Sequence, residues 1–369
     1  MAQKTITNNI MITEQYKDKV YFSKWFKSDY PDIYHNVCNI LDENNVAHDT
    51  LSLTKDYWCR DYMPVQFACG CFAQFKYKPD YLEGKEKYMT NADRVISSLK
   101  DTNIHVYHSS LVVDGGNIVV CEADIPNTYT KKSFIVMTDK VLMENPFLSK
   151  EEIERRIKRA FAVDECPNMN DGMCIVWLPW DEKDKCGHTD GILKFVGTNE
   201  NDRPVVLANL SVYEENIASK MRKILQEYFE VEELKLSKFD ELSWAYINAL
   251  QTRDVIVVPG IGNEKLDKEA MKQMESLYPE YKGRIYQVQM KSFIKRWGGA
   301  LNCCTWTVSN DMSKLPHNKG NNERYNSLVN MYRNNHNSLT IEDIKFLGGY
   351  YPKALCSISS MLDKLYFGF

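Results

Sequence analysis

Short apolar runs of strand type alternate along this sequence with longer segments that have the apolar spacing of amphipathic helices. The strand-type runs are residues 65–67, 104–107, 118–121, 134–137, 174–178, 192–196, 205–210 and 254–258. Helical spacing occurs in the first 50 residues, at Ile33, Val37, Ile40 and Leu41, and again over residues 150–162, 214–229 and 266–277. Strands that alternate with helices along a chain predict an α/β fold.

The sequence also predicts how the chain is divided. No linker rich in proline, glycine and serine interrupts the first 310 of the 369 residues, which favours one domain over residues 1–310. A polar, turn-rich stretch follows at residues 309–322, and apolar spacing of helical type then continues to the end. We therefore expect residues 311–369 to form a helical extension that packs on the same domain.

The composition argues against several classes of function. The formal net charge is −4 and no run of five basic residues occurs, so we expect no nucleic-acid partner. No segment has the roughly 20 apolar residues that span a bilayer, and the N-terminal segment is polar, so we expect a cytoplasmic protein without a membrane partner. The eleven cysteines are irregularly spaced and include no CxxC pair, which argues against a structural zinc site.

Four short segments place polar or reactive side chains among glycines and aromatic residues. They are residues 57–64 (YWCRDYMP), 111–117 (LVVDGGN), 186–191 (CGHTDG) and 297–306 (WGGALNCCTW). Each has an ordinary structural explanation: a salt bridge between Arg60 and Asp61, a tight turn, a surface histidine, and two buried thiols.

Each segment also has a functional explanation. The carboxylate of Asp61, beside the ring of Trp58, suits a cationic ligand. His188 and Asp190 are two residues apart, so they project the same way from extended backbone. This pair supplies only two metal ligands, and we expect no metal site.

The order of the motifs WxRDxxP, DGGN, GHxDG and GGxxxCxT resembles the agmatine deiminase and bacterial (Porphyromonas-type) peptidylarginine deiminase family of the guanidine-modifying, or pentein, superfamily. The resemblance covers residues 55–310 and includes WAYIN at 244–248, followed by VIVVP at 255–259. It implies a five-bladed α/β propeller with the active site in its central channel. It also implies a hydrolase of carbon–nitrogen bonds, and that chemistry requires no metal or organic cofactor.

The resemblance assigns a role to each motif position. It implies that Cys303 is the nucleophile, that His188 is the general acid and base, and that Asp61 and Asp190 hold a guanidinium group. Asp114 stands where many relatives have glutamate, and we expect it to orient His188. The residues expected to contribute to substrate binding are Trp58, Arg60, Asp114, Gly116, Asn117 and Asn248.

Two features depart from the family pattern. Relatives usually have histidine immediately before the nucleophilic cysteine, where this chain has Asn302. This departure bears on the substrate class more than on the chemistry. Family chains also tend to end soon after the strand that follows the cysteine, whereas this chain continues through residues 311–369.

The chemistry explains why these residue types are needed. A guanidinium group is a delocalised cation whose planar N–H groups suit carboxylate acceptors, and two carboxylates would fix its carbon against a thiolate. Attack gives a tetrahedral adduct, and ammonia leaves with a proton from His188. A covalent thiouronium remains, and neutral His188 then activates the water that releases a ureido product.

Three interpretations of function remain at this point. The first is a deiminase whose partner is a small guanidine such as agmatine, with free arginine and peptidyl arginine as alternatives. The second is an amidinotransferase, which would pass the same intermediate to an amine. The third is a catalytically silent binding or interaction protein on the same scaffold, supported only by Asn302 and the extension. The sequence leaves the oligomeric state open.

Overall fold

The described residues form five small sheets that repeat one arrangement. The computed structural model describes residues 11–68, 71–99, 104–124, 131–161 and 173–310. Its strands are β1 (Lys19–Ser23), β2 (Ala47–Leu51), β3 (Val65–Ala68), β4 (Cys71–Lys76), β5 (His105–Val112), β6 (Val119–Asp124), β7 (Lys131–Thr138), β8 (Met173–Leu178), β9 (Leu193–Thr198), β10 (Pro204–Ala208), β11 (Glu230–Glu233), β12 (Leu250–Gln251), β13 (Ile256–Gly260), β14 (Ile285–Gln289) and β15 (Thr305–Val308).

Each sheet in these ranges has three strands, and the orders are β15-β1-β2, β3-β4-β5, β6-β7-β8, β9-β10-β11 and β12-β13-β14. In every sheet the middle strand pairs antiparallel with the strand named first. It pairs parallel with the strand named last. The first sheet joins β1 to β15, so the two ends of the described chain are held in one sheet.

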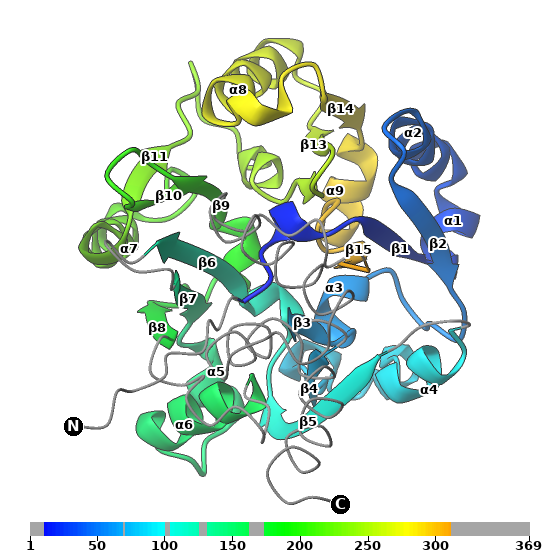
Figure 1. The fold of residues 1–369 in the computed structure, drawn as a ribbon, viewed down its shortest axis with the longest axis vertical. Coiled ribbons are helices and arrows are strands. Elements are labelled where there is room, and N and C mark those ends of the chain that lie inside the picture. The colour runs from blue at the N-terminus through cyan, green and yellow to red at the C-terminus, as the bar shows by residue number, and fades with distance from the viewer. Residues whose placement is uncertain (1–10, 69–70, 100–103, 125–130, 162–172, 311–369) are drawn as a thin grey trace, which may run out of the picture.

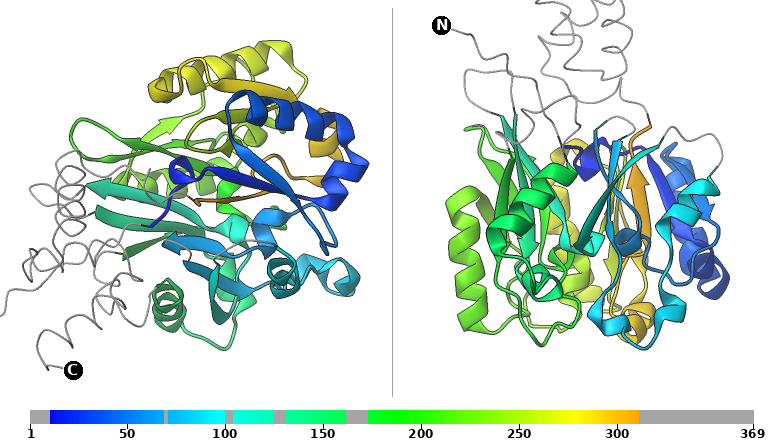
Figure 2. Two further views of the ribbon diagram at one scale, coloured as in Figure 1. Left: turned by 45° about the vertical axis from the view of Figure 1, so that its right-hand side comes forward. Right: turned by 90° about the horizontal axis from the view of Figure 1, so that it is seen from below.

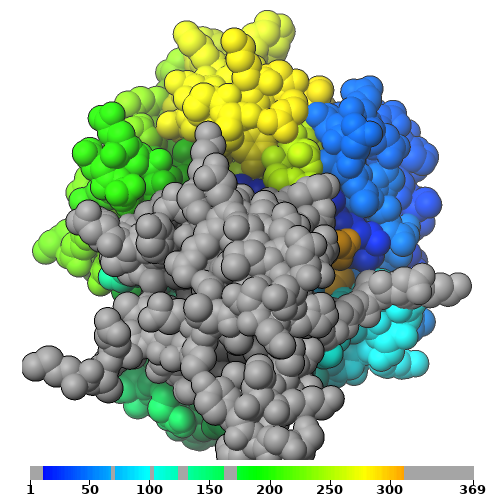
Figure 3. Space-filling model, in the orientation of Figure 1, coloured from blue at the N-terminus to red at the C-terminus, as the bar shows by residue number. Residues whose placement is uncertain are grey.

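Helices occupy the connections between the parallel strands, because a parallel pair needs a crossover. They are α1 (Lys24–Asp29), α2 (Pro31–Glu43), α4 (Ala92–Ser97), α5 (Lys140–Glu144), α6 (Lys150–Ala160), α7 (Glu215–Tyr228) and α8 (Glu264–Leu277). Figure 1 shows the sheets following one another around the middle of the molecule, with the helices outside. The views in Figure 2 show the same outer layer, and the green, yellow, blue and cyan surfaces of Figure 3 follow the same order around the rim.

The longer helices cover the sheets with one apolar face each. Helix α7 buries Ala218, Met221 and Leu225, and α8 buries Leu266, Ala270 and Met274. These positions are three or four residues apart, so they lie on one side of the helix. The apolar spacing that predicted α7 and α8 therefore corresponds to the helix faces that are buried.

The prediction of an α/β fold is confirmed. The predicted strand-type runs overlap β3, β5, β6, β7, β8, β9, β10 and β13, and the predicted helical segments overlap α2, α6, α7 and α8. The helical expectation for the first 50 residues is wrong in part, because β1 and β2 flank α1 and α2. The closed, five-bladed arrangement stays a prediction.

The strands that the sequence did not predict lack a continuous apolar run. Strand β2 reads AHDTL, and only Leu51 of its five residues is fully buried. Strand β11 reads EVEE and carries three charged side chains. Both are outer strands of their sheets, where polar residues are tolerated because one edge is unpaired.

The helical extension predicted for residues 311–369 lies outside the described residues. The extension and the division of the chain at residue 310 therefore stay predictions. In the described part of the chain, no helix combines the length and the apolar character needed to cross a bilayer.

Ser149 caps helix α6, as its position before the helical pattern indicates. Its side-chain oxygen accepts a hydrogen bond from the backbone N–H of Glu152 at 3.3 Å. The carboxylate of Glu152 is engaged by Arg155 at 2.8 Å and Arg156 at 2.6 Å. The hydroxyl is therefore the cap on which the first turn depends.

We predict that Ser149→Ala lowers the free energy of unfolding by about 1 kcal/mol, because one N–H group of the first turn loses its acceptor. Urea unfolding measures the change. Ser149→Asp keeps an acceptor at the same place and should remain close to wild type. An equal loss in both variants would show that the cap does not contribute.

Candidate active site

The segments that carry the predicted site residues occupy equivalent places in the five sheets. Each segment directly precedes the strand that pairs antiparallel with the middle strand of its sheet, namely β3, β6, β9, β12 or β15. The segments are α3 (Cys59–Tyr62), η4 (Gly115–Asn117), η6 (Thr189–Gly191), the residues after η7 (Ser243–Tyr246), and the turn at residues 301–304. Helix α3 contacts η4 and β15, and η4 contacts η6. The repeated topology thus brings together residues that are far apart in sequence.

His188 lies between two carboxylates. Its Nε2 is 3.1 Å from Oδ2 of Asp114, and its Nδ1 is 3.5 Å from Oδ1 of Asp61. Tyr81 donates its hydroxyl proton to the same Oδ2 of Asp114 at 2.8 Å. The backbone N–H of Gly116 donates to Oδ1 of Asp61 at 3.1 Å. The imidazole therefore has a carboxylate on each side, and the orienting role of Asp114 stays a prediction.

These carboxylates change the proton affinity of the imidazole. Burial lowers the pKa of His188, but the charges of Asp61 and Asp114 outweigh burial and hold this pKa well above its usual value. Burial also raises the pKa of Asp61; His188 opposes this rise, while Asp114 and Asp190 add to it. The pair of Asp61 and His188 consequently retains a proton at neutral pH.

Cys303 lies beside Asp190 and is held by its backbone. Its Sγ is 3.8 Å from Oδ2 of Asp190. Its backbone N–H donates to Oδ1 of Asn248 at 3.1 Å, and its carbonyl accepts from the backbone N–H of Arg60 at 3.1 Å. Asn248 also donates from Nδ2 to the carbonyl of Asp190 at 3.3 Å. The thiol therefore has a fixed position relative to the carboxylate.

The thiol is protonated in the resting protein. Burial raises the pKa of Cys303 well above its usual value, and the negative charges of Asp190 and Asp61 raise it further. A thiolate would form there only if positive charge entered the site. Cys303 is 7% exposed, whereas its neighbour Cys304 is fully buried in the core, so only Cys303 faces the site.

Carboxylates dominate the charge of this site. Oδ1 of Asp114 and Oδ2 of Asp56 are buried acceptors without a hydrogen-bond partner in the described part of the chain. Burial raises the pKa of Asp56 to about 7, and the charge of Asp114 acts in the same direction. His188 is the cationic group placed against them. The arrangement favours a cationic ligand.

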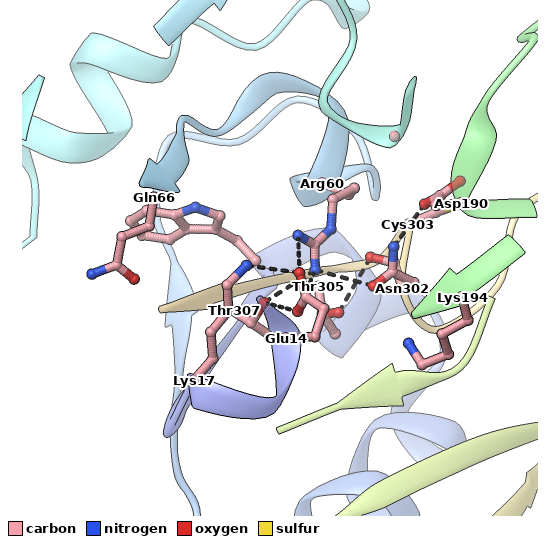
Figure 4. A network of polar contacts seen from close by, with 12 residues as sticks. Glu14, Lys17, Arg60, Gln66, Asp190, Lys194, Asn302, Cys303, Thr305 and Thr307 are labelled. Carbon is pink, nitrogen blue, oxygen red and sulfur yellow. Dashed lines mark hydrogen bonds and ion pairs between the residues drawn. The ribbon is translucent and has the colours of Figure 1, made fainter. Parts of the chain in front are cut away.

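The guanidinium group of Arg60 pairs with a different carboxylate from the one that the sequence suggested. This group pairs with Glu14, with Nη1 3.1 Å from Oε1 (Figure 4). Its Nη2 donates to Asn302 and to Thr307, each at 3.1 Å. The salt bridge that we considered between Arg60 and Asp61 is thus replaced by one with Glu14. The side chain is occupied by protein partners, which gives no support to direct substrate binding.

The other predicted binding residues shape the site. Oδ1 of Asn117 accepts from the backbone N–H of Thr138 and the hydroxyl of Thr189, both at 2.8 Å, so Asn117 joins η4 to η6. The indole of Trp58 lies against Gly299, where a Cβ atom would come within 2.1 Å of the ring. Trp58 is partly exposed and packs against the hydrophobic core, next to the segment that leads to Cys303.

Two residues of the site were missed from the sequence. Tyr81 and Asp56 lie in segments without a recognised motif, and only their contacts with Asp114 and with the turn at Trp58 identify them. The described residues contain no group of three or more His, Cys, Asp or Glu side chains that could hold a metal ion. The expectation of no cofactor stays a prediction.

The sequence pattern of the Porphyromonas-type peptidyl-arginine deiminase family matches residues 32–308. The chain belongs to this family. Residues 32–308 include all of the site residues that the motifs predicted.

One curated relative has low sequence identity to this chain. A curated protein of Marinomonas sp. (strain MWYL1), provisionally named an agmatine deiminase, is 25% identical over 236 residues, which are 56% of this chain. The chain thus spans only 59% of the length of this relative.

Solved structures show the same fold. An agmatine deiminase of C. jejuni with substrate bound is 16% identical, with a TM-score of 0.58 over 81% of this chain and 96% of that chain. An agmatine deiminase of Enterococcus faecalis is also 16% identical, with a TM-score of 0.56 over 84% of this chain and 100% of that chain. At these identities the likeness shows that the chain shares the fold of these two proteins.

Gly116 provides a direct test of this geometry. A Cβ atom on Gly116 would lie 2.6 Å from Nδ1 of His188 and 2.7 Å from Oδ1 of Asp61. We predict that Gly116→Ala lowers the free energy of unfolding by about 1–3 kcal/mol, because the imidazole or the carboxylate must move.

The control is Gly191→Ala in η6. The nearest atom to a Cβ at Gly191 belongs to Trp244, at 3.7 Å, so the methyl group has room. Urea unfolding of both variants makes the comparison. Equal stability of Gly116→Ala and wild type would contradict the close approach of η4 to His188.

Proposed function

We propose that this family member is a deiminase that hydrolyses the guanidinium group of a small substrate to a ureido product and ammonia. The observation that carries the proposal is the arrangement of one thiol and one imidazole among buried carboxylates. Cys303 lies beside Asp190, and His188 lies between Asp61 and Asp114. The names of the relatives in the family point to the same reaction.

The carboxylates of Asp61 and Asp190 would bind the planar guanidinium group. Both are at least nine-tenths buried and both bear electrostatically on Cys303. A cation held between them would neutralise the charges that keep the thiol protonated, and the thiol would then lose its proton to solvent. The substrate therefore activates its own nucleophile.

The reaction proceeds in two halves. The thiolate of Cys303 attacks the guanidinium carbon, and the C–N bond to the leaving amine breaks as His188 gives that nitrogen a proton. Asp114 holds Nε2 of His188, which leaves the Nδ1 side facing Asp61 and the guanidinium that it would bind. Neutral His188 then takes a proton from water, the hydroxide attacks the thiouronium carbon, and the C–S bond breaks.

The charge of the site favours a substrate without a carboxylate near the guanidinium. Asp56, Asp61, Asp114 and Asp190 would repel the carboxylate of free arginine more than the second amino group of agmatine. Agmatine or a similar small guanidine is therefore the substrate class that we propose. The cytoplasmic location stays a prediction from the sequence, and the oligomeric state stays open.

Replacing the thiol tests the proposed reaction. We predict that Cys303→Ser lowers the rate of ammonia release from agmatine by at least about a thousandfold, because the covalent intermediate can no longer form. The matched control is Cys304→Ala, which changes the adjacent buried thiol and should retain most of the activity. Mass spectrometry of the quenched wild-type reaction should show an adduct on Cys303. Full activity of Cys303→Ser would overturn the proposal.

A substrate panel tests the charge argument. We predict that kcat/KM for agmatine exceeds that for free arginine by about a hundredfold, because the arginine carboxylate would meet carboxylates of the site. A short peptide with C-terminal arginine completes the panel. Ammonia release that requires an added amine would indicate an amidinotransferase, and a preference for arginine would contradict the proposed substrate class.

A further inference from the structure

Asn302 links the substrate-facing carboxylate to a buried ionic network. Its Nδ2 donates to Oδ2 of Asp190 at 2.7 Å, and its Oδ1 accepts from Nη2 of Arg60 at 3.1 Å (Figure 4). Its backbone N–H donates to the carbonyl of Asn248 at 3.0 Å. Asn302 is 7% exposed, so these partners replace water. Both polar ends of the Asn302 side chain therefore form a hydrogen bond with a charged neighbour.

The chemistry of the two neighbours fixes the direction of the amide. An ionised carboxylate only accepts hydrogen bonds, and a guanidinium group only donates them. The N–H₂ end of Asn302 must therefore face Asp190, and its oxygen must face Arg60. A rotation of the amide by half a turn would place its oxygen against the carboxylate of Asp190 and its N–H₂ group against the guanidinium of Arg60.

The network behind Asn302 holds Arg60 in place. Nη1 of Arg60 is 3.1 Å from Oε1 of Glu14, and Nζ of Lys17 is 2.7 Å from the same oxygen. Thr307 on β15 donates to Oε2 of Glu14 at 2.6 Å and accepts from Nη2 of Arg60. Burial opposes ionisation of Glu14, but the charges of Arg60 and Lys17 hold its pKa well below the usual range. Arg60 is thus a fixed donor for Asn302.

The contact between Asn302 and Asp190 also concerns the thiol. Oδ2 of Asp190 is the oxygen that receives the N–H of Asn302, and it is the oxygen that lies 3.8 Å from Sγ of Cys303. The thiol of Cys303 and the amide of Asn302 thus share one acceptor oxygen, and loss of Asn302 would leave this oxygen to the S–H proton and free to rotate away from a bound guanidinium. With Asn302, part of its negative charge is taken up by the amide.

We propose that Asn302 is a positioning residue, which holds Asp190 toward the guanidinium and competes with the thiol proton for its Oδ2, so that Cys303 ionises more readily. The expected effect of Asn302 on turnover rests on the proposed function. Its effect on the thiol belongs to the resting protein and is measured without substrate.

Nearby ionisable groups change the pKa of the Cys303 thiol. Among the described residues, Asp190 on η6 and Asp61 on α3 raise the pKa of the Cys303 thiol, and Cys304 is the adjacent titratable thiol. The buried Lys194 on β9 interacts electrostatically with Asp190. Asn302 lies between this set and Arg60. A change at Asn302 therefore alters the field at Sγ through Asp190.

Three variants separate positioning from packing. Asn302→Leu removes both amide contacts. Asn302→Asp keeps the size and the acceptor for Arg60, but its ionised carboxylate cannot donate to Asp190. Asn302→His restores both contacts, because a neutral imidazole donates from one nitrogen and accepts at the other. Asn302 is one of the residues that line a cavity of about 40 Å³.

The matched control is Thr307→Val. It removes a hydrogen bond to Arg60 from the same buried network, but Thr307 does not contact Asp190. All variants are made in the full chain with Cys304→Ala, so that the peptide around Cys303 contains one cysteine. Thermal unfolding identifies any variant that fails to fold.

The first measurement is the pH dependence of Cys303 alkylation by iodoacetamide, followed by mass spectrometry. We expect Asn302→Leu and Asn302→Asp to raise the pH of half-maximal alkylation by about one unit, because the thiol proton gains an acceptor. Asn302→His and Thr307→Val should leave the profile unchanged. An unchanged profile in both Asn302→Leu and Asn302→Asp, or an equal shift in Thr307→Val, would overturn the inference.

The second measurement is kcat/KM for agmatine. We expect a loss of about tenfold to a hundredfold in Asn302→Leu, the usual effect of removing a hydrogen bond to a charged group, and recovery in Asn302→His. If wild type releases no ammonia from any guanidine, the proposed function fails and the alkylation profiles still decide the inference. If wild type is active and Asn302→Leu matches it in both measurements, the inference alone fails.

Discussion

The buried carboxylates around His188 are the constraint on which this site depends. Asp61 and Asp114 flank the imidazole, and Asp190 adds a further negative charge near the thiol. Buried charges of one sign are unfavourable unless a partner compensates them. His188 compensates part of the charge by retaining a proton, and Asp61 compensates another part by a raised pKa. The remaining deficit of positive charge is what a guanidinium substrate would supply.

The repeated topology explains how distant residues meet at one point. In each of the five sheets, the segment that precedes the antiparallel outer strand carries one part of the site. The backbone then fixes these segments to one another, since Arg60 donates its N–H to the carbonyl of Cys303 and Asn248 joins Cys303 to Asp190. Gly116 completes the arrangement, because no side chain fits between it and His188.

The sequence predicted the helices and the motif residues, because both leave local signals. Apolar spacing marks the buried faces of α7 and α8, and motif order placed Asp61, His188 and Cys303 in one family. Outer strands such as β11 have no apolar run and were not predicted. The direction of the Arg60 side chain depends on Glu14, which lies 46 residues earlier, and no local pattern records such a contact.

Burial and the carboxylates of Asp190 and Asp61 account for a further property of Cys303. A thiol with a raised pKa is poorly reactive, so the resting protein protects Cys303 from adventitious reaction. Such protection is useful only if the same groups can release the proton when the correct cation arrives. Asp190 serves both purposes, because its charge holds the thiol proton and would also bind the guanidinium. Its orientation would decide between the two states, and hydrogen bonds link this carboxylate through Asn302 to Arg60 and Glu14. On the proposed mechanism, the asparagine before Cys303 would therefore help to couple guanidinium binding to ionisation of the thiol.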